Sequence, residues 1–260
     1  MGMPRIDRVG LDASTARSMA PQKLNMPDFC KIAIIAALER EVRPLIQNWH
    51  CTRKPCEGHE FKFYESDGIA VVCGGIGPAA ARRASEAIIN LYHPGLVISA
   101  GFAGALDPAL ELGHAFTPRQ VIDAADGSHT DCPEGDSILI TFGDVADVEQ
   151  KTKLGTAYGA HAVDMEAASV ARCAQAHGIK FLACKVISDT SDTGLPPIAR
   201  FISTDGNFHA LQFLAYVAIR PWLWAGVRRL ASNSQIAASN LCSMLAETAK
   251  ANTADWILTR

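Results

Sequence analysis

Short apolar runs recur along the chain, separated by polar or glycine-containing segments. Such runs, bounded by turn residues, are typical of strands that are covered on both faces of a sheet. Strands are predicted at 31–37, 69–73, 96–100, 138–142 and 181–187. Helices are predicted at 38–49, 79–91 and 164–177, the first of them broken early by Pro44. This order of elements fits an open α/β sheet.

The stretch 162–192 combines a helix, a turn, a buried strand and a polar run. Asp189 comes after the strand with Ser188 beside it, and ligands bind at the carboxyl ends of strands in open α/β sheets. Asp164 and Glu166 stand at the helix start, where the positive end of the helix dipole stabilises carboxylates. Helix capping and a solvated loop would explain the same acids, so composition alone leaves both interpretations open.

The composition is typical of a single-domain protein with reduced thiols. The 260 residues are 48% hydrophobic, which is enough for one sizeable core. The net charge of −3 provides no positive field for polyanions, so no nucleic-acid partner is predicted. Eight scattered cysteines favour free thiols in a cytoplasmic protein over a disulfide framework.

The two ends of the chain differ from its middle. Residues 1–28 are polar, lack periodicity and contain no apolar signal region, so a disordered extension is predicted. Residues 29–260 are predicted to form one domain whose last third, about 207–250, is helical, with Pro221 breaking or restarting a helix. The segment 207–230 combines Trp and other apolar residues with arginines. This pattern is typical of a peripheral membrane helix and equally of a core or dimer-contact helix.

Two weaker motifs suggest other chemistry. Four potential metal ligands lie close together in sequence: His50, Cys51, Cys56 and His59. Their spacing is irregular and a hairpin around 61–64 explains the region, so no metal site is predicted. Gly75, Gly77 and Ala80 fit the dinucleotide pattern G-x-G-x-x-A. No acidic residue follows about twenty residues later, where it would bind the ribose of a dinucleotide, so a close-packed turn is the better explanation.

Several longer stretches carry a family resemblance. They are IAIIAALEREVRPL from Ile32, GGIGPAAARRASEAIINL and VISAGFAGALDPAL between Gly74 and Leu110, and MEAASVARCAQAHGIKFLACKVISDTSD ending at Asp192. In this order they resemble the purine nucleoside phosphorylase and nucleosidase superfamily, which includes the methylthioadenosine/S-adenosylhomocysteine nucleosidases. The resemblance implies a three-layer α/β/α sandwich around a mixed central sheet, a homo-oligomer and a purine nucleoside substrate. It implies no cofactor, with inorganic phosphate as an alternative co-substrate to water.

The last of these stretches corresponds to the family's nucleoside site. Met165 and Glu166 match a Met-Glu pair that holds the ribose. Ser188 and Asp189 match a Ser-Asp pair that contacts the purine. Lys185, where relatives often have Arg, would support the same loop.

Cleavage of the bond between ribose and purine creates two charges, because the base departs as an anion and the ribose becomes positive. Asp189 is the candidate acid for the base, and Glu166 can accept the ribose hydroxyl hydrogens and stabilise the positive ring. To hold a proton near neutrality, Asp189 needs a poorly solvated place or a neighbouring negative charge. Glu41, three places before Pro44, matches the family's carboxylate that holds and activates the attacking water.

Small residues follow the strand at 96–100, and their backbone amides can approach a ligand. This predicted substrate-binding turn comprises Gly101, Phe102, Ala103 and Gly104. Family members commonly have Ser at the position of Phe102, and phosphorolytic members have Arg at the position of Ser99. Without that Arg, phosphate would depend on Arg40, Arg43 or the amides of the turn, so water and phosphate both remain as nucleophiles.

The C-terminal layout, with LPP at 195–197, DG at 205–206 and a later Arg-Pro, resembles the hopanoid-biosynthesis-associated phosphorylases. These act on an adenosine-capped triterpenoid lipid. The resemblance therefore implies cleavage of the N-glycosidic bond of an adenosyl-type nucleoside, with adenosylhopane among the candidates. Methylthioadenosine-like and ordinary nucleosides remain alternatives.

Two other classes of function stay open. A non-catalytic nucleoside- or lipid-binding protein on the same scaffold would explain Phe102 and the short segment 113–138. It would also explain Val145 and Ala146, which stand where many relatives have an aromatic that stacks on the purine. An NAD-dependent enzyme would rest on the glycine pattern alone.

Overall fold

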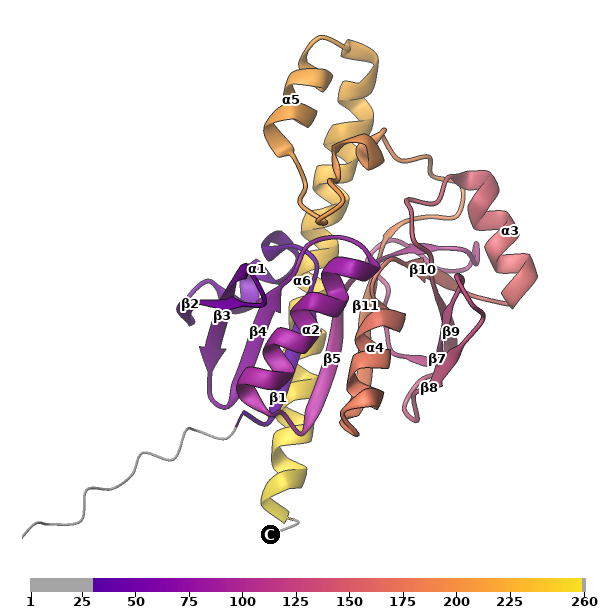
Figure 1. Cartoon of the computed structure of the whole chain (residues 1–260). Helices are drawn as coiled ribbons and strands as arrows, with labels where there is room; N and C mark the ends of the chain where they lie inside the picture. Colours follow the sequence, from indigo (N-terminus) through magenta and orange to yellow (C-terminus); the bar gives the residue numbers. More distant parts are fainter. Residues whose placement is uncertain (1–29, 259–260) are drawn as a thin grey trace, which may run out of the picture.

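The structure, a computed structural model, describes residues 30–258 of the chain (Figure 1). Its elements in chain order are β1 (Ile32–Ala36), α1 (Glu39–Ile46), β2 (His50–Cys56), β3 (His59–Ser66), β4 (Ile69–Cys73), α2 (Pro78–Tyr92), β5 (Leu96–Ala105), β6 (Ala115–Phe116), β7 (Pro118–Asp123), β8 (His129–Asp131), β9 (Ser137–Thr141), α3 (Val148–Tyr158), β10 (Ala162–Asp164), α4 (Ala167–Ala176), β11 (Lys180–Asp189), η1 (Ile198–Phe201), α5 (Ala210–Ala218), η2 (Pro221–Leu223) and α6 (Trp224–Leu258). The described strands form one sheet in the order β2-β3-β4-β1-β5-β10-β9-β7-β8, and β11 pairs with β5 and β6. The sheet is mixed: β1 and β11 run parallel to β5, whereas β10 runs antiparallel to it.

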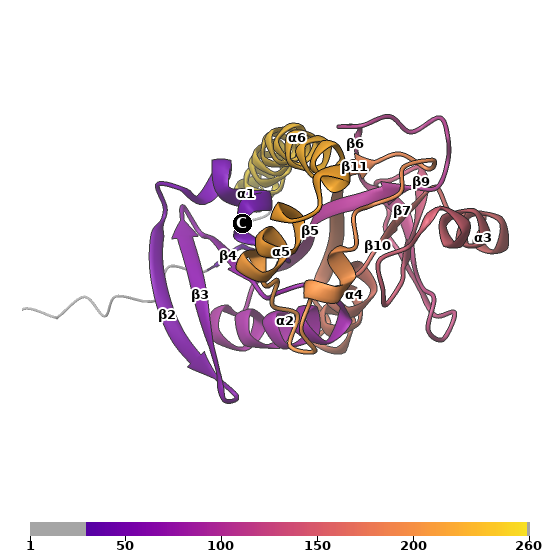
Figure 2. The same cartoon turned by 90° about the horizontal axis from the view of Figure 1, so that it is seen from above.

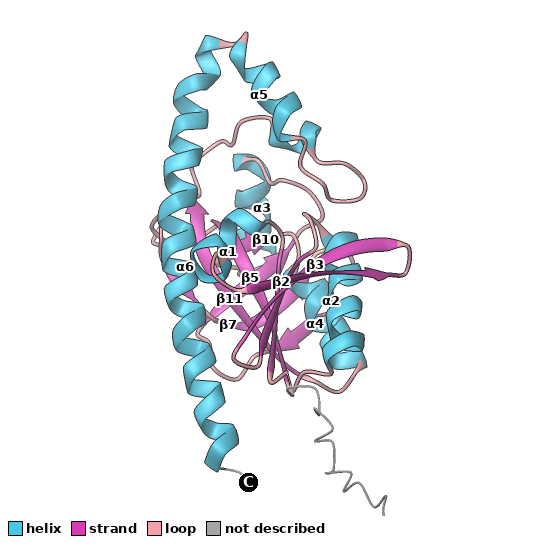
Figure 3. Ribbon diagram, turned by 90° about the vertical axis from the view of Figure 1, so that its left-hand side faces the viewer, coloured by secondary structure: helices cyan, strands magenta, loops and turns pink. Residues whose placement is uncertain are grey.

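Helices cover both faces of this sheet. Helices α2 and α4 pack on one face (Figure 2), and α1 and the long α6 pack on the other (Figure 3). Successive side chains of a strand point to opposite faces, so a doubly covered strand must be apolar throughout. In β1, Ala33 and Ile35 join the core beneath α2 and α4, and Ile34 joins the core beneath α1 and α6. The structure therefore confirms the three-layer α/β/α sandwich around a mixed central sheet.

The middle strand β5 is longer than predicted. The sequence pattern ended it at residue 100 and assigned the following small residues to a ligand-binding turn. Instead, Gly101 to Ala105 continue the strand, because β11 pairs with β5 as far as Gly104 and β10 pairs with Gly104 and Ala105. The sheet therefore fixes these small residues in place.

Other boundaries also differ from the prediction. The helix predicted from residue 164 begins at Ala167, because Asp164 ends the short strand β10. Asp164 still caps this helix, since the Ala167 N–H donates to its Oδ2 at 2.9 Å. The first helix continues past Pro44 but ends two residues later at Ile46, before the predicted end at residue 49. Helix α3 and strands β6 to β8 have no counterpart among the predicted elements.

The C-terminal part of the chain lies partly outside the sheet. Pro221 opens the short helix η2 between α5 and α6. Helix α5 and the first turns of α6 project beyond the sheet (Figure 1), where Phe201, Phe213 and Val217 form a small separate core. No helix among the described residues is both long and apolar enough to cross a bilayer.

Four further predictions concern metal binding, the cysteines, the N-terminal extension and the domain division. The metal-ligand candidates at residues 50–59 lie on the hairpin β2–β3. Across residues 30–258, no group of three or more His, Cys, Asp or Glu side chains is arranged to hold a metal ion. All eight cysteines have free thiols. The extension predicted at 1–28 lies outside the described residues, and the single domain at 29–260 stays a prediction.

Candidate active site

One cavity lies at the carboxyl ends of β1, β10 and β11. The predicted site residues that line it are Glu41, Phe102, Ala103, Gly104, Met165, Glu166, Ser188 and Asp189. Gly101 and Lys185 are not among its lining residues, but Gly101 lies close to both Glu41 and Lys185. A Cβ atom built on Gly101 would lie 3.4 Å from Glu41 Oε2 and 3.7 Å from Lys185 Nζ. Three carboxylates that are distant in sequence, on Glu41, Glu166 and Asp189, thus face one cavity.

Glu41 lies in the first turn of α1 and is 6% exposed. The Leu38 backbone N–H donates to its Oε2 at 3.4 Å. Burial raises the pKa of the Glu41 carboxyl above its ordinary value, because the charged form loses its contact with water. Glu41 is therefore a better proton acceptor than an exposed carboxylate.

Glu166 is the residue before α4, at the edge of the cavity. Its Oε1 accepts a hydrogen bond from the Gly77 N–H at 2.8 Å. Burial, followed by the negative charge of Asp164, raises the pKa of the Glu166 carboxyl to about 8. The glycine motif that suggested dinucleotide binding thus contributes a backbone donor to a cavity carboxylate.

Lys185 is the buried cation at the centre of this acidic group. Its ammonium pairs with Asp164 Oδ2 at 2.8 Å and donates to Ser99 Oγ at 3.1 Å. Asp164 Oδ1 also accepts from Thr141 Oγ1 at 2.6 Å. Burial alone would lower the pKa of Lys185, but the negative charges of Asp164, Glu166 and Glu41 outweigh it and raise the pKa. Lys185 therefore neutralises a buried carboxylate, and its role in supporting the loop after β11 stays a prediction.

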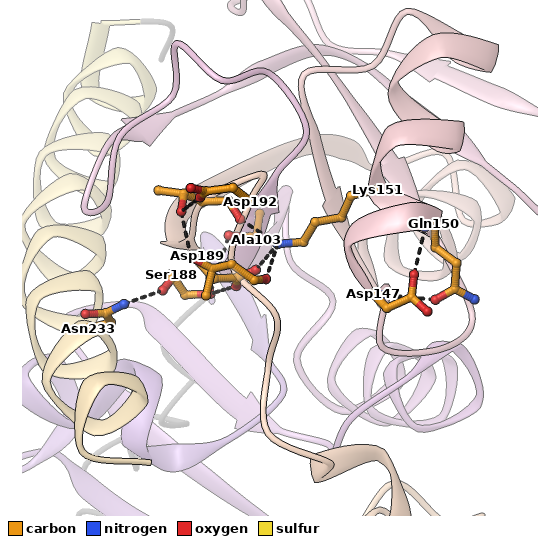
Figure 4. Close-up of polar contacts among 10 residues, drawn as sticks. Ala103, Asp147, Gln150, Lys151, Ser188, Asp189, Asp192 and Asn233 are labelled. Carbon is orange, nitrogen blue, oxygen red and sulfur yellow. Dashed lines mark hydrogen bonds and ion pairs between the residues drawn. The ribbon is translucent and has the colours of Figure 1, made fainter. Parts of the chain in front are cut away.

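Asp189, at the end of β11, has a partner that the sequence did not suggest (Figure 4). Ser188 Oγ donates to Asp189 Oδ1 at 2.7 Å, and the ammonium of Lys151 pairs with Asp189 Oδ2. Asp189 is 5% exposed, so it lies in the poorly solvated place that was expected. Its charged neighbour is a cation, however, and not another acid.

Lys151 was missed because no helix was predicted around it. One signal was present: Asp147 and Gln150 form a capping box that begins α3. The apolar pattern of α3 is weak, since Lys151 is the buried residue of that helix.

Segments that follow β11 in the chain form one side of the cavity. Leu195, Ile198, Ile202 and, from α6, Leu230 and Ser234 are among its lining residues. The turn before α5 is held against the glycine loop, because the Ile76 N–H donates to Gly206 O at 2.8 Å and Arg83 donates to Asp205 O at 2.9 Å. Among the predicted phosphate-binding arginines, Arg40 lines the cavity, whereas Arg43 is exposed and is not among the lining residues.

Replacing Gly206 by Ala should destabilise the turn before α5. A Cβ on Gly206 would lie 2.5 Å from Ile76 O, and its φ of +82° is unfavourable for a side chain. Gly58 has the same φ of +82° but nothing within 4 Å of a built Cβ, so Gly58→Ala isolates the backbone cost of about 1–2 kcal/mol. Urea unfolding should show a larger loss of unfolding free energy for Gly206→Ala than for Gly58→Ala. Equal losses would mean that the turn moves away without cost.

The raised pKa of Glu166 predicts a pH dependence of stability. The ordinary value is 4.5 and the folded value is about 8, so between these pH values only the folded chain holds the extra proton. The contribution of this group is therefore fully present below pH 4.5 and is lost as the pH rises through 8. The free energy of unfolding of the wild type, relative to Glu166→Gln, should fall over that window. The exposed variant Glu149→Gln serves as control, and a flat difference for Glu166→Gln would contradict the prediction.

The sandwich, with its acidic cavity at the strand ends, defines a protein of the nucleoside phosphorylase-like α/β class. The sequence model of the Phosphorylase superfamily matches residues 31–149 and 139–205, and the chain belongs to this superfamily.

Individual relatives agree with this assignment. The chain is 28% identical over 224 residues to a 5'-methylthioadenosine/S-adenosylhomocysteine nucleosidase of Shewanella loihica, covering 71% of this chain and 97% of the relative. It is similar in fold to the nucleosidase of the same name from Neisseria meningitidis, with a TM-score of 0.63 and 18% identity over 85% of this chain and 99% of that one. It also resembles the futalosine hydrolase of Helicobacter pylori, with a TM-score of 0.61 and 21% identity over 84% of this chain and 98% of that one.

Proposed function

We propose that the protein cleaves the N-glycosidic bond of a purine nucleoside and releases the base. The observation that carries this proposal is the convergence of Glu41, Glu166 and Asp189 on one cavity. The nucleosidase name of the Shewanella loihica relative supports the same reaction class. From that name we infer that the substrate is an adenosyl-type nucleoside.

Each carboxylate has a role that suits its surroundings. Asp189, held from two sides, directs the proton to the departing base, which would otherwise leave as an unstable anion. Glu166, in the same cavity lining, binds the ribose hydroxyls with Met165 against the sugar, and in its ionised form it stabilises the positive ring. Glu41, with its raised pKa, accepts a proton from the attacking nucleophile. Together these groups stabilise both charges that develop as the bond breaks, and so they lower the activation barrier.

We propose water as this nucleophile. The described cations among the lining residues are Arg40 and Lys151, and Lys151 is already paired with Asp189. Ser99, in place of the Arg of phosphorolytic relatives, accepts a hydrogen bond from Lys185. Arg40 alone is a weak supply of charge for a phosphate dianion.

The test is release of free purine from adenosine, methylthioadenosine and an adenosyl-capped lipid, each with and without inorganic phosphate. Hydrolysis predicts release in the absence of phosphate, and a strict requirement for phosphate would replace water by phosphorolysis. Tight binding without release from any of these substrates would favour the non-catalytic binding protein.

The substrate that we propose carries an apolar group on the ribose 5′ carbon, adenosylhopane being one example. Leu195, Ile198, Ile202 and Leu230 provide an apolar side of the cavity. The projecting α5–η2–α6 segment exposes large apolar side chains: Leu211, Leu214, Ile219, Trp222 and Trp224. Exposed Arg228 follows them in the chain, and arginines beside apolar residues suit an anionic membrane surface.

A double replacement should test this surface. Leu211 and Trp222 are 83% and 73% exposed, so Leu211→Ser with Trp222→Ser should fold normally. It should lower binding to phosphatidylglycerol vesicles in co-sedimentation by about tenfold or more, because each large side chain contributes over 1 kcal/mol when buried. Leu91→Ser with Val148→Ser, at 42% and 39% exposure elsewhere, is the control. Loss of a dimer instead of vesicle binding would assign the surface to a second copy of the chain.

A further inference from the structure

Lys151 reaches the end of β11 from α3, a helix on which Leu154 and Tyr158 are only partly buried against the neighbouring core. Its side chain is 2% exposed, and burying a lysine is costly unless its charge and its N–H groups are matched. An ammonium has three N–H donors. Three acceptors surround it, namely Asp189 Oδ2, Thr190 O at 2.8 Å and Thr193 O at 3.4 Å. Lys151 therefore has no unused donor for a substrate and acts through Asp189.

The sheet leaves room for this lysine. A Cβ built on Gly104 would lie 3.0 Å from Asp189 Oδ2 and 3.3 Å from Lys151 Cε. These distances are shorter than ordinary contacts of a Cβ atom, so a larger residue at this position of β5 would require Asp189 or Lys151 to shift. The absence of a side chain at residue 104 is thus matched to the Lys151–Asp189 pair.

The pair changes where the reaction's proton is held. Asp189 accepts hydrogen bonds on both oxygens, from Ser188 on Oδ1 and from Lys151 on Oδ2. Both oxygens of Asp189 therefore act as acceptors, and an acceptor has no hydrogen to donate to a base. The ammonium beside it does have one.

We propose that Lys151 is a positioning residue that holds Asp189 and shares with it the proton delivered to the departing base. This inference rests on the proposed function. As the bond between C1′ and the base breaks, its electron pair leaves with the base. The proton passes from Lys151 Nζ to Asp189 and from Asp189 to a ring nitrogen of the base. Water forms the new bond to C1′ and loses one proton to Glu41, which releases it to solvent while Lys151 is reprotonated.

The test compares Lys151→Met and Lys151→Arg with the matched variants Lys153→Met and Lys153→Arg. Lys153 lies on the same helix, and its side chain is 71% exposed. Met keeps much of the side-chain length but has no ionisable group. Arg keeps the positive charge but does not release its proton. Base release is measured on adenosine and on 7-methyladenosine, whose methylated base leaves without needing a proton.

Both Lys151 variants should lose about 10²–10⁴-fold in kcat on adenosine with little change in KM. On 7-methyladenosine they should stay within about tenfold of the wild type, and the Lys153 variants should match the wild type on both substrates. Equal losses on the two substrates, or near-complete activity of Lys151→Arg on adenosine, would overturn the proposal, because a merely structural clamp behaves in that way.

Three other outcomes can also be interpreted. If Lys151→Arg melts far below the wild type, the proposal is judged on Lys151→Met alone, by comparing its activity loss on adenosine with its loss on 7-methyladenosine. If the wild type rejects the methylated nucleoside, Lys151→Arg on adenosine decides: activity near the wild type overturns the proposal, and a loss like that of Lys151→Met supports it. A wild type that releases base from neither substrate contradicts the proposed function itself.

Discussion

Replacing Asp189 by Asn is expected to lower the rate of base release by about 10²–10⁴-fold, which is the usual contribution of a general acid. Asn has nearly the same shape and can still accept the hydrogen bond that Ser188 Oγ donates at 2.7 Å. It can neither carry a proton to the base nor form an ion pair with Lys151. The loss should therefore appear in kcat, with KM changed little.

Asp192→Asn is the matched control for this variant. Asp192 lies three residues further on, is exposed and accepts from Thr190 Oγ1 at 2.6 Å. Its replacement should leave base release unchanged. Because Asp189→Asn leaves the buried ammonium of Lys151 without a counter-ion, rates are measured well below the melting temperature of each variant. Full activity of Asp189→Asn would remove Asp189 from the mechanism and, with it, the role proposed for Lys151.

The sequence predicted those parts of the fold that depend on local pattern. The strands β1 and β4 are apolar along their whole length and β11 is mostly apolar, because helices cover both faces of the sheet, and such runs are visible without a structure. Asp189 was placed correctly at a strand end for the same reason. The convergence of Glu41 and Glu166 with it followed from the family resemblance, since residues from three separate segments cannot be brought together by periodicity.

The parts that were missed depend on contacts between distant segments. β10 has three residues, too few for a period, so Asp164 was assigned to the helix that it only caps. β5 runs on through Gly101 because β11 pairs with it, which a glycine in the sequence does not reveal. Lys151 lies three and seven residues before Leu154 and Tyr158, which pack against the core, so a charged residue occupies a position where the apolar pattern of a helix would predict an apolar one.

The largest loss of stability is expected from Lys185→Met. The side chains of Lys185 and Asp164 are 1% and 0% exposed, and removing one partner of a buried ion pair costs about 3–5 kcal/mol because the other charge is left without compensation. The matched control is Lys62→Met. Its ion pair with Glu39 has a similar distance, 2.7 Å against 2.8 Å, but the side chains are 41% and 46% exposed. An exposed pair contributes about 0–1 kcal/mol, so the control should change little.

A second replacement separates the orphaned charge from the lost packing. Asp164→Asn removes the negative charge but keeps an oxygen that can accept from Thr141 Oγ1 or from the Ala167 N–H. In the wild type this change leaves Lys185 with less compensation and should destabilise the protein. In the Lys185→Met background the same change should restore part of the lost free energy of unfolding, measured by urea denaturation in a double-mutant cycle. If Asp164→Asn costs the same in both backgrounds, the two charges are not coupled. Lys185 would then stabilise the fold by filling space beneath the cavity and not by neutralising its acids.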